Sequence, residues 1–273
     1  VFNYIVGVER GWITRQQGAE RVLRMTDFLL NKVRTFWGVY PHWLNGETGE
    51  IIPLSKGNDG SDLLESAFMV MGLIGAREYF DGSTPTEKRL RRNVNRIWHG
   101  VDWASHASVR PDGMKAFHWV WSPSTKGFYP NLYCSGYSEN HMTYLLALSS
   151  PTHRVSDDYY HQGWESPDFI EQTSRHGVDP TFTWGYRISL FPAHFAYMAL
   201  DPKQVHYQGK SYFDYLQNLC LAQYRYIPTR KDEFKGYKHP LWGLSAGCSP
   251  VPGNFKAHAP SDAWEHSGDS DNG

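Results

Sequence analysis

An acidic segment near residue 60 is the first part of the chain whose residue types could do chemistry. Asp59, Asp62 and Glu65 place three carboxylates within seven residues, between a glycine-rich turn and an apolar run. Asp62 and Glu65 are three residues apart, so on a helix they share a face. Carboxylates this close raise one another's pKa, and they can bind sugar hydroxyls or activate water. The same spacing also predicts a structural pair, in which Asp62 caps the helix and Glu65 completes a capping box.

A second candidate is Glu139, which opens an apolar run and follows a tryptophan-rich stretch. Beside aromatic side chains such as Tyr137 and Trp121, a carboxyl is partly desolvated. Desolvation raises its pKa, as the general acid of a glycosidase requires. The alternative is a glutamate in the first turn of a helix, where the helix dipole favours an acid.

Histidines are the third group. His153 and His194 lie next to aromatic segments and could bind substrate, although a core or surface histidine is the more ordinary interpretation of each. None of the 13 histidines has the spacing of a metal site. Glycine-rich phosphate loops and the Gly-x-Ser-x-Gly motif are absent from the sequence, so we expect neither a metal nor a cofactor.

The composition fits a carbohydrate-binding protein. Aromatic residues make up 15% of the chain, with 11 Trp and 17 Tyr, and their flat apolar faces suit sugar rings, although a large aromatic core would need them too. The net charge of -1 and the scattered Lys and Arg argue against nucleic-acid binding. No apolar run reaches the ~20 residues of a membrane span. Three cysteines without Cys-x-x-Cys spacing predict buried free thiols.

The elements that must position these residues are mostly helices. Apolar periodicity, caps and stops predict helices over residues 14–36, 61–80, 84–100, 138–148, 156–165, 189–200 and 211–226. Two apolar patches around Asn45-Gly46 predict a short hairpin, and residues 102–133 predict a long loop with a few short strands. No linker divides the chain, so we expect one domain over 1–273, built of helical hairpins in a ring with loops at one mouth.

Several motifs, in order, resemble those of the glucoamylase-like glycoside hydrolases, a group that includes the endo-β-1,2-glucanases of glycoside hydrolase family 144. They are Gly57 to Met69, Gly136-Tyr137-Ser138-Glu139, Leu145 to His153, Leu190 to Phe195, Tyr212-Phe213 and Leu241 to Ala246. The resemblance implies an all-α fold, an (α/α)6 toroid. It also implies metal-free hydrolysis of a β-linked glucan, with inversion.

The resemblance also implies roles for individual residues. Glu139 matches the acid, and Asp62 and Glu65 match acidic residues of the substrate pocket. The matched motifs carry four further binding candidates, which are Asn58, His153, His194 and Trp242. The family has Asp where this chain has Asn58, and its members continue past the position of Gly273. We therefore expect a toroid that is incomplete at the carboxyl end and lacks a general base.

The sequence therefore predicts a glycoside hydrolase acting on a β-glucan, with β-1,2-glucan the best single substrate. Glu139 would protonate the leaving oxygen, while Asp59, Asp62, Glu65, Tyr137 and Trp121 would hold the sugar. The alternatives are a carbohydrate-binding toroid without turnover, or a transglycosylase or lyase on the same scaffold. We expect a monomer whose partner is an oligo- or polysaccharide. A polymeric substrate favours a secreted or periplasmic location.

Overall fold

The computed structural model describes residues 1–167, 169–170, 174–234, 236–237, 240–248, 255–258 and 260. The chain divides into two compact units. Unit 1 comprises Val1–Cys134 and Met142–Gly163, and unit 2 comprises Ser135–His141 and Trp164–Gly273. We describe each unit by itself, and a single ring-shaped domain stays a prediction.

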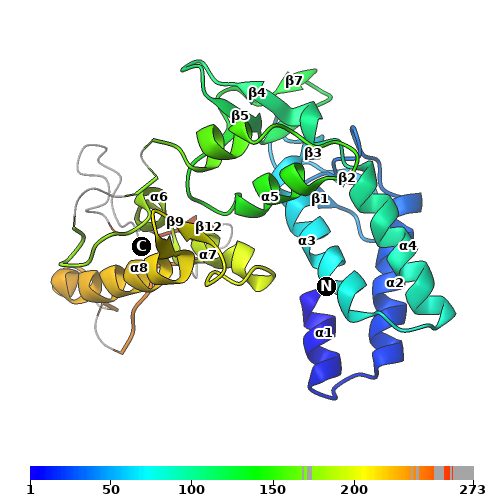
Figure 1. The fold of residues 1–273 in the computed structure, drawn as a ribbon, viewed down its shortest axis with the longest axis horizontal. Helices are drawn as coiled ribbons and strands as arrows, with labels where there is room; N and C mark the ends of the chain where they lie inside the picture. The colour runs from blue at the N-terminus through cyan, green and yellow to red at the C-terminus, as the bar shows by residue number, and fades with distance from the viewer. Residues whose placement is uncertain are drawn as a thin grey trace. The chain divides into compact units, whose positions relative to one another are not determined.

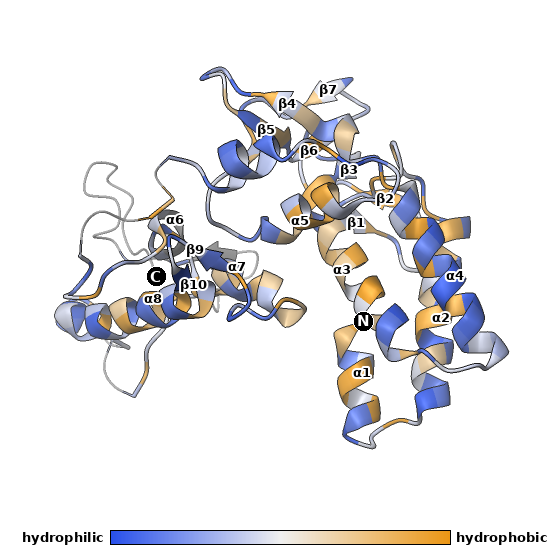
Figure 2. Ribbon diagram, viewed as in Figure 1, coloured by the Kyte–Doolittle hydropathy of each residue, from blue (hydrophilic) through white to orange (hydrophobic). Residues whose placement is uncertain are grey.

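Unit 1 is built on four helices (Figure 1). They are α1 (Phe2–Glu9), α2 (Arg15–Asn31), α3 (Leu63–Tyr79) and α4 (Pro85–Gly100). The helices α2 and α4 lie side by side and are joined by Asn93, whose amide donates to Thr26 Oγ1 and Asp27 Oδ1 at 3.1 and 2.8 Å. Figure 2 shows α4 with a hydrophilic side, whereas α3 is mostly hydrophobic. The reason is burial: α3 is buried on much of its circumference, so its residues are apolar on most sides.

The helix starts follow their capping residues. Thr84 caps α4 by accepting from the backbone N–H of Glu87 at 3.2 Å, with Pro85 at the first helical position. Thr14 and Gln17 form a capping box at α2. Predicted helix 84–100 is thereby confirmed, whereas predicted helix 14–36 ends early, at Asn31.

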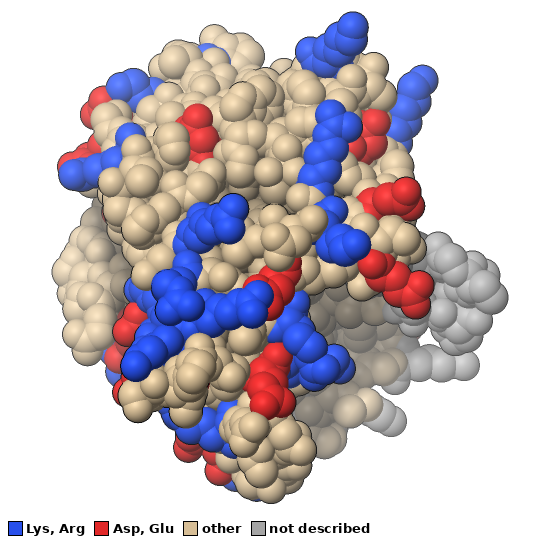
Figure 3. Space-filling model, turned by 90° about the vertical axis from the view of Figure 1, so that its right-hand side faces the viewer, with Lys and Arg blue, Asp and Glu red and all other residues tan. Residues whose placement is uncertain are grey.

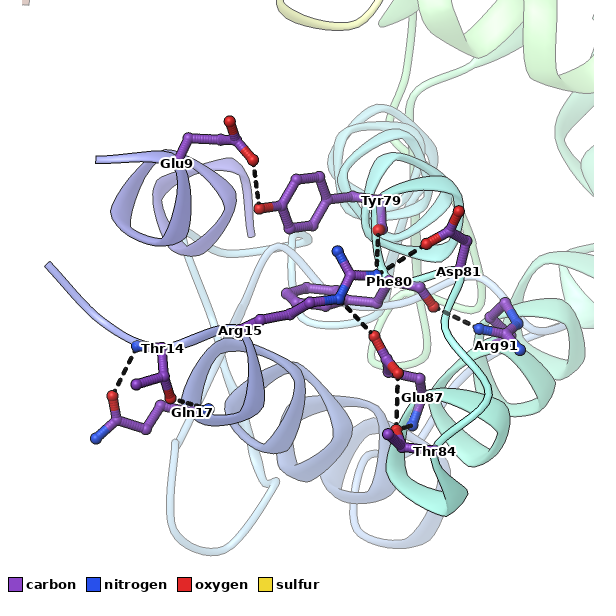
Figure 4. Close-up of polar contacts among 10 residues, drawn as sticks. All are labelled: Glu9, Thr14, Arg15, Gln17, Tyr79, Phe80, Asp81, Thr84, Glu87 and Arg91. Atoms are coloured by element: carbon purple, nitrogen blue, oxygen red, sulfur yellow. Dashed lines mark hydrogen bonds and ion pairs between the residues drawn. The ribbon is translucent and has the colours of Figure 1, made fainter. Parts of the chain in front are cut away.

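An ion pair between the exposed Arg15 and the buried Glu87 joins the ends of three helices in unit 1 (Figure 4). Arg15 donates to Glu87 Oε1 at 2.8 Å, to the Tyr79 carbonyl at 2.8 Å and to Asp81 at 2.9 Å. Glu87 is 4% exposed. Burial alone would raise the pKa of Glu87, but its hydrogen bonds to Thr84 and Arg15 lower it. The pair therefore ties the start of α2 to the end of α3 and the start of α4.

Short strands decorate these helices. β1 (Trp43–Leu44) and β2 (Ile51–Ile52) form the expected antiparallel hairpin. Two three-stranded antiparallel sheets, in the orders β3-β6-β7 and β4-β5-β8, form mainly from the predicted loop region, and β3 comes from the segment before α3. Their strands are β3 (Ser61–Asp62), β4 (Ala107–Val109), β5 (Lys115–His118), β6 (Val120–Ser122), β7 (Gly127–Phe128) and β8 (Tyr133–Cys134). The 3₁₀ helix η1 (Trp103–His106) precedes β4, and α5 (His141–Ser149) and the π-helix η2 (Tyr160–Trp164) follow β8. The described residues combine long helices with several short strands, which agrees with the predicted helical class with short strands in its loops, while the toroid itself stays a prediction.

Unit 2 is centred on α8 (Tyr212–Tyr226), whose predicted bounds are confirmed (Figure 1). Ser211 and Asp214 form its capping box. Shorter elements accompany it: α6 (Thr183–Arg187), α7 (Leu190–His194), η3 (Phe195–Met198), η4 (Ile227–Arg230), β9 (His206–Tyr207), β10 (Lys210–Ser211), β11 (Ala246–Cys248) and β12 (Phe255–Ala257). The helix predicted over 189–200 is therefore α7 followed by a 3₁₀ turn.

Aromatic rings fill the core of unit 2. Tyr137 stacks on Phe182 with ring centroids 3.7 Å apart, and His141 stacks on Trp164 at 4.3 Å. All four side chains are fully buried. Part of the aromatic content of the sequence therefore serves packing rather than ligand contact.

Candidate functional site

Asp62 lies at the centre of a buried polar cluster in unit 1. Its Oδ1 atom accepts from the backbone N–H of Glu65 and from the Trp119 indole N–H, both at 3.0 Å. Its Oδ2 atom lies 2.8 Å from His42 Nδ1. The residue has no exposed surface. Asp62 is therefore the N-cap of α3, as the structural interpretation of the sequence predicted.

Glu65 is not the reciprocal partner of that cap. The Asp62 N–H donates to the Tyr40 carbonyl at 2.8 Å, so the capping box expected from the spacing is absent. The Glu65 carboxyl instead lies 4.0 Å from His42 Nε2, and its side chain is 37% exposed. Burial and the charge of Asp62 raise the pKa of Glu65, while His42 opposes the shift. Glu65 is thus an accessible carboxyl that holds its proton to a higher pH than usual.

His42 joins the two carboxyls, and sequence reasoning missed it. It precedes Asp62 by 20 residues, and no local spacing links them. The backbone of Tyr40 places it: its N–H donates to Ser66 Oγ at 2.8 Å, and its carbonyl accepts from the Asp62 N–H. Trp43 meets the His42 ring edge-on, with centroids 5.6 Å apart, and is 51% exposed. The signal in the sequence was a histidine beside a tryptophan in a turn-rich stretch.

Trp121 and Asp62 lie on opposite faces of the sheet that β3 and β6 form. The pairing of β3 with β6 sets Trp121 opposite Ser61 and Val120 opposite Asp62. A side chain at Gly60 would collide with the Trp121 carbonyl oxygen, so this close approach of β3 to β6 needs a glycine there. The indole of Trp121 packs on Phe36 and Trp37, at 4.9 and 5.0 Å between centroids. The structure therefore does not bring Trp121 into contact with the Asp62 cluster.

The same face carries a buried histidine. His106 Nε2 lies 3.0 Å from Ser61 Oγ, and its Nδ1 lies 3.0 Å from the His118 carbonyl. Burial lowers the pKa of His106 to about 4. A neutral, fully buried histidine with both nitrogens engaged stabilises the sheet.

Asn58 and Asp59 lie just upstream of β3. The backbone of Asn58 closes a turn with Ser55 at 3.0 Å, and Asp59 accepts from the Ser122 hydroxyl at 2.5 Å. Both residues are partly exposed. Asp59 is therefore oriented by Ser122 of β6. In the described part of the chain it makes no hydrogen bond to the Asp62 carboxyl.

Glu139 lies in unit 2, in the turn before α5. The helix begins at His141, so Glu139 is not in its first turn and the dipole interpretation does not apply. Gly136 adopts φ +69°, and the buried Asn140 amide closes the turn. In the orientation that satisfies its neighbours, this amide donates to the Gly136 carbonyl at 3.2 Å and accepts from the Ser135 N–H at 2.9 Å. The half-buried Glu139 is thus carried by a well-anchored turn.

Tyr137, in the same turn, differs from its predicted placement. It is fully buried, and its hydroxyl donates to the Ala193 carbonyl at 2.8 Å. Burial raises its pKa. Tyr137 therefore anchors the turn that carries Glu139 and offers no exposed surface to a sugar. Its predicted role in substrate binding stays a prediction, and its burial argues against that role.

The remaining candidates are spread over both units. In unit 1, His153 is partly exposed and lies 3.5 Å from Asp102. In unit 2, His194 Nδ1 lies 2.7 Å from the Leu190 carbonyl and its Nε2 lies 3.8 Å from Cys220 Sγ. Trp242 is 43% exposed and contacts Tyr224. Of these three residues, Trp242 is the one with an exposed aromatic ring of the kind that sugars stack on.

The described residues contain no cluster of three His, Cys, Asp or Glu side chains that could hold a metal. No helix among them combines the length and apolar character that a bilayer crossing demands. Cys134 and Cys220 carry thiols rather than disulfides; Cys134 is buried, as predicted, whereas Cys220 is partly exposed. The side chain of Cys248 lies outside the described part.

Comparison with known proteins decides the family. The family model Glycoamylase, described as "Putative glucoamylase", matches residues 131–271, about half of the chain. The chain belongs to the Glycoamylase family. The resemblance read from the sequence motifs is confirmed.

Relatives of this Glycoamylase chain are longer than it is. An exo β-1,2-glucooligosaccharide sophorohydrolase from Parabacteroides distasonis is 29% identical over 279 residues, which cover 95% of this chain and 38% of the relative. A solved structure from Bacteroides uniformis ATCC 8492, with the same description as the family, is 35% identical with a TM-score of 0.84. The endo-β-1,2-glucanase from Chitinophaga pinensis, solved with sophorotriose and glucose, is 33% identical with a TM-score of 0.83. The chain is covered to 94% in both comparisons and spans 62% and 61% of those two chains.

Proposed function

We propose that the protein is a glycoside hydrolase that cleaves a β-linked glucan, with β-1,2-linked glucan as its substrate. The observation that carries the proposal is the Asp62–His42–Glu65 cluster. It presents a partly exposed carboxyl with a raised pKa, next to the exposed ring of Trp43. Two relatives, from P. distasonis and C. pinensis, are named for β-1,2-glucan hydrolysis, which supports the choice of linkage.

The proposed reaction divides the work among carboxyl groups. Glu139 gives its proton to the leaving glycosidic oxygen as the C1–O bond breaks. A second carboxylate takes a proton from water, whose oxygen attacks C1 from the opposite face, so the product is inverted. Glu65 holds substrate hydroxyls. Asp62 positions His42 and Glu65 rather than touching the sugar, since it is fully buried.

We further propose that the helices of the whole protein close into an (α/α)6 toroid and that it acts outside the cytoplasm as a monomer. The hairpin-and-loop order of α1 to α4 suits a toroid. A polymeric glucan does not enter cells readily, which favours a secreted or periplasmic location.

A carbohydrate-binding protein without turnover is the second candidate. Asn58 favours it, because an amide cannot act as a base where relatives are expected to carry Asp. The first candidate requires the general base to come from another carboxylate.

One experiment tests both candidates. Linear β-1,2-, β-1,3-, β-1,4- and β-1,6-glucans are incubated with the protein, and reducing ends are measured beside calorimetric binding. The hydrolase predicts reducing ends from β-1,2-glucan far above those from the other linkages. Binding without product would favour the binding protein, and neither binding nor product would overturn both.

A further inference from the structure

A pocket of about 440 Å³ opens in unit 1 between the carboxyl end of α2 and the β1–β2 hairpin. Its volume is in the range of small-ligand sites. The polar groups that line it come from Lys32, Arg34, Glu50 and Asp59, and the apolar wall includes Phe36 and Ile51. None of these residues belongs to the Asp62–His42–Glu65 cluster.

The hairpin wall of this pocket is fixed by local hydrogen bonds. Asn45 Oδ1 accepts from the N–H groups of Glu47 and Thr48 at 2.8 and 3.1 Å, and the Gly49 N–H donates to the Asn45 carbonyl at 2.9 Å. A side chain at Gly49, where φ is +81°, would collide with the Lys32 carbonyl. The hairpin turn therefore lies directly against the end of α2, and the pocket is preformed.

The pocket is lined by two cationic and two anionic side chains, and its cations form no ion pairs with carboxylates among the described residues. Lys32 and Arg34 are exposed, and in the described part of the chain neither lies within ion-pair distance of a carboxylate. Asp59 is engaged through one oxygen with Ser122, and Glu50 with Thr48 at 3.3 Å. Two cations and two anions sum to zero, so the lining suits a neutral ligand that both donates and accepts hydrogen bonds.

Polyhydroxylated sugars have this chemistry. Their hydroxyls donate to carboxylates and accept from lysine and arginine, while their C–H faces contact apolar walls. Arg34 lies over the Phe36 ring at 4.8 Å, which holds the guanidinium at the pocket. A phosphate or nucleotide would instead need an excess of positive charge.

The pocket is also structurally connected to the candidate site. Asp59 precedes Asp62 by three residues, and Phe36 packs on Trp121 of β6, the strand that pairs with Ser61–Asp62. We infer that this pocket binds a sugar unit of the glucan beyond the units held at the reaction centre. The inference rests on the proposed function, since it assumes that the protein acts on a glucan.

Two variants test the pocket, Arg34→Ala and Glu50→Gln. The matched control is Arg24→Ala, an exposed arginine on α2 outside the pocket. Steady-state kinetics compare long linear β-1,2-glucan with a β-1,2-linked trisaccharide. We expect each pocket variant to raise KM for the long glucan about threefold to tenfold, with kcat and trisaccharide hydrolysis unchanged, as loss of ~1 kcal/mol of binding predicts.

Unchanged KM values in both variants would overturn the inference, as would an equal loss with both substrates. If the wild type hydrolyses no glucan, the proposed function fails, and calorimetry with linear β-1,2-gluco-oligosaccharides tests the pocket directly. Weaker binding by Arg34→Ala than by Arg24→Ala would then support it. Equal binding by the two, or no binding by the wild type, would overturn it.

Discussion

His42 acts as a link between a sealed carboxylate and an accessible one. Asp62 contacts Nδ1 at 2.8 Å and Glu65 lies 4.0 Å from Nε2, so the buried aspartate orients the ring toward the glutamate. The two acids of the sequence motif thus have different environments. One is sealed among hydrogen-bond partners and the other is open to solvent, so the two acids are suited to different roles.

Replacing Asp62 with Asn should lower the pKa of Glu65 toward its ordinary value. The amide oxygen can still accept from the Glu65 N–H and the Trp119 indole, but the negative charge that raises the pKa of Glu65 is gone. The measurement is a pH titration of the Glu65 side-chain carbon by NMR. Asp112→Asn, far along the chain and exposed, is the control, and a Glu65 pKa that stays or rises in Asp62→Asn would refute this account.

Residue identities in this cluster could be predicted only where they are close in sequence. Asp62, Glu65 and the N-cap followed from a three-residue spacing. His42 and Trp119 could not, because they reach Asp62 through the Tyr40 backbone contacts and the β3–β6 pairing, both of which are long-range. The sequence also could not predict which aromatic side chains are buried, because no local pattern distinguishes the buried Tyr137 from the exposed Trp43.

At the scale of elements, His106 couples η1 to two sheets through Ser61 and His118. Its pKa in the folded state, about 4, lies below the ordinary 6.5. Between these values the unfolded chain binds a proton that the folded chain does not, so stability falls as pH falls. The contribution of His106 to the free energy of unfolding is fully present above pH 6.5. It decreases by up to about 3 kcal/mol as the pH approaches 4.

Urea unfolding at pH 7.0 and pH 4.5 measures this dependence. His106→Gln, which cannot titrate, should lose less stability on acidification than the wild type. Some dependence should persist in the variant, because burial also lowers the pKa of His141 and His118. Identical pH dependence in both proteins would contradict the role assigned to His106.

The Arg15–Glu87 pair is the second test at this scale. Arg15→Met leaves a nearly buried carboxylate without its cation, and we expect a loss of about 1–3 kcal/mol in the free energy of unfolding. Arg92→Met, an exposed arginine on α4, should change it by less than about 0.5 kcal/mol. A double variant Arg15→Met/Glu87→Gln should be less destabilised than the sum of the single variants, whereas strict additivity would show that the pair is not coupled.

Elements with local signals were predictable and the others were not. Thr84-Pro85 and Ser211 mark the starts of α4 and α8, and both helices match their predicted ranges. The helix α1 escaped prediction although it packs on α2 and α3, because only eight residues carry its pattern. The π-helix at Tyr160–Trp164 stands where an α-helix was expected, since periodicity does not distinguish π from α turns.

For the molecule as a whole, the sequence predicts how the charges are distributed, but it does not predict whether the helices close into a ring. Lys and Arg are interspersed with Asp and Glu on the face of the molecule that Figure 3 shows. In unit 1, Arg89 pairs with Asp27 at 2.9 Å. This face is a solvated, mixed surface, as the scattered charges predicted. Closure into a ring depends on helices packing far apart in sequence, and the chain spans about three fifths of the solved relatives. The toroid is therefore proposed from family membership rather than from local pattern.

In the mechanism that we propose, glucan hydrolysis depends on the carboxyl group of Glu139. The release of reducing ends from linear β-1,2-glucan is followed for the wild type and for Glu139→Gln at equal concentration, with binding of the same glucan recorded in parallel. The account predicts steady release by the wild type and none by the variant, which still binds the glucan. Equal release by the two proteins would contradict it.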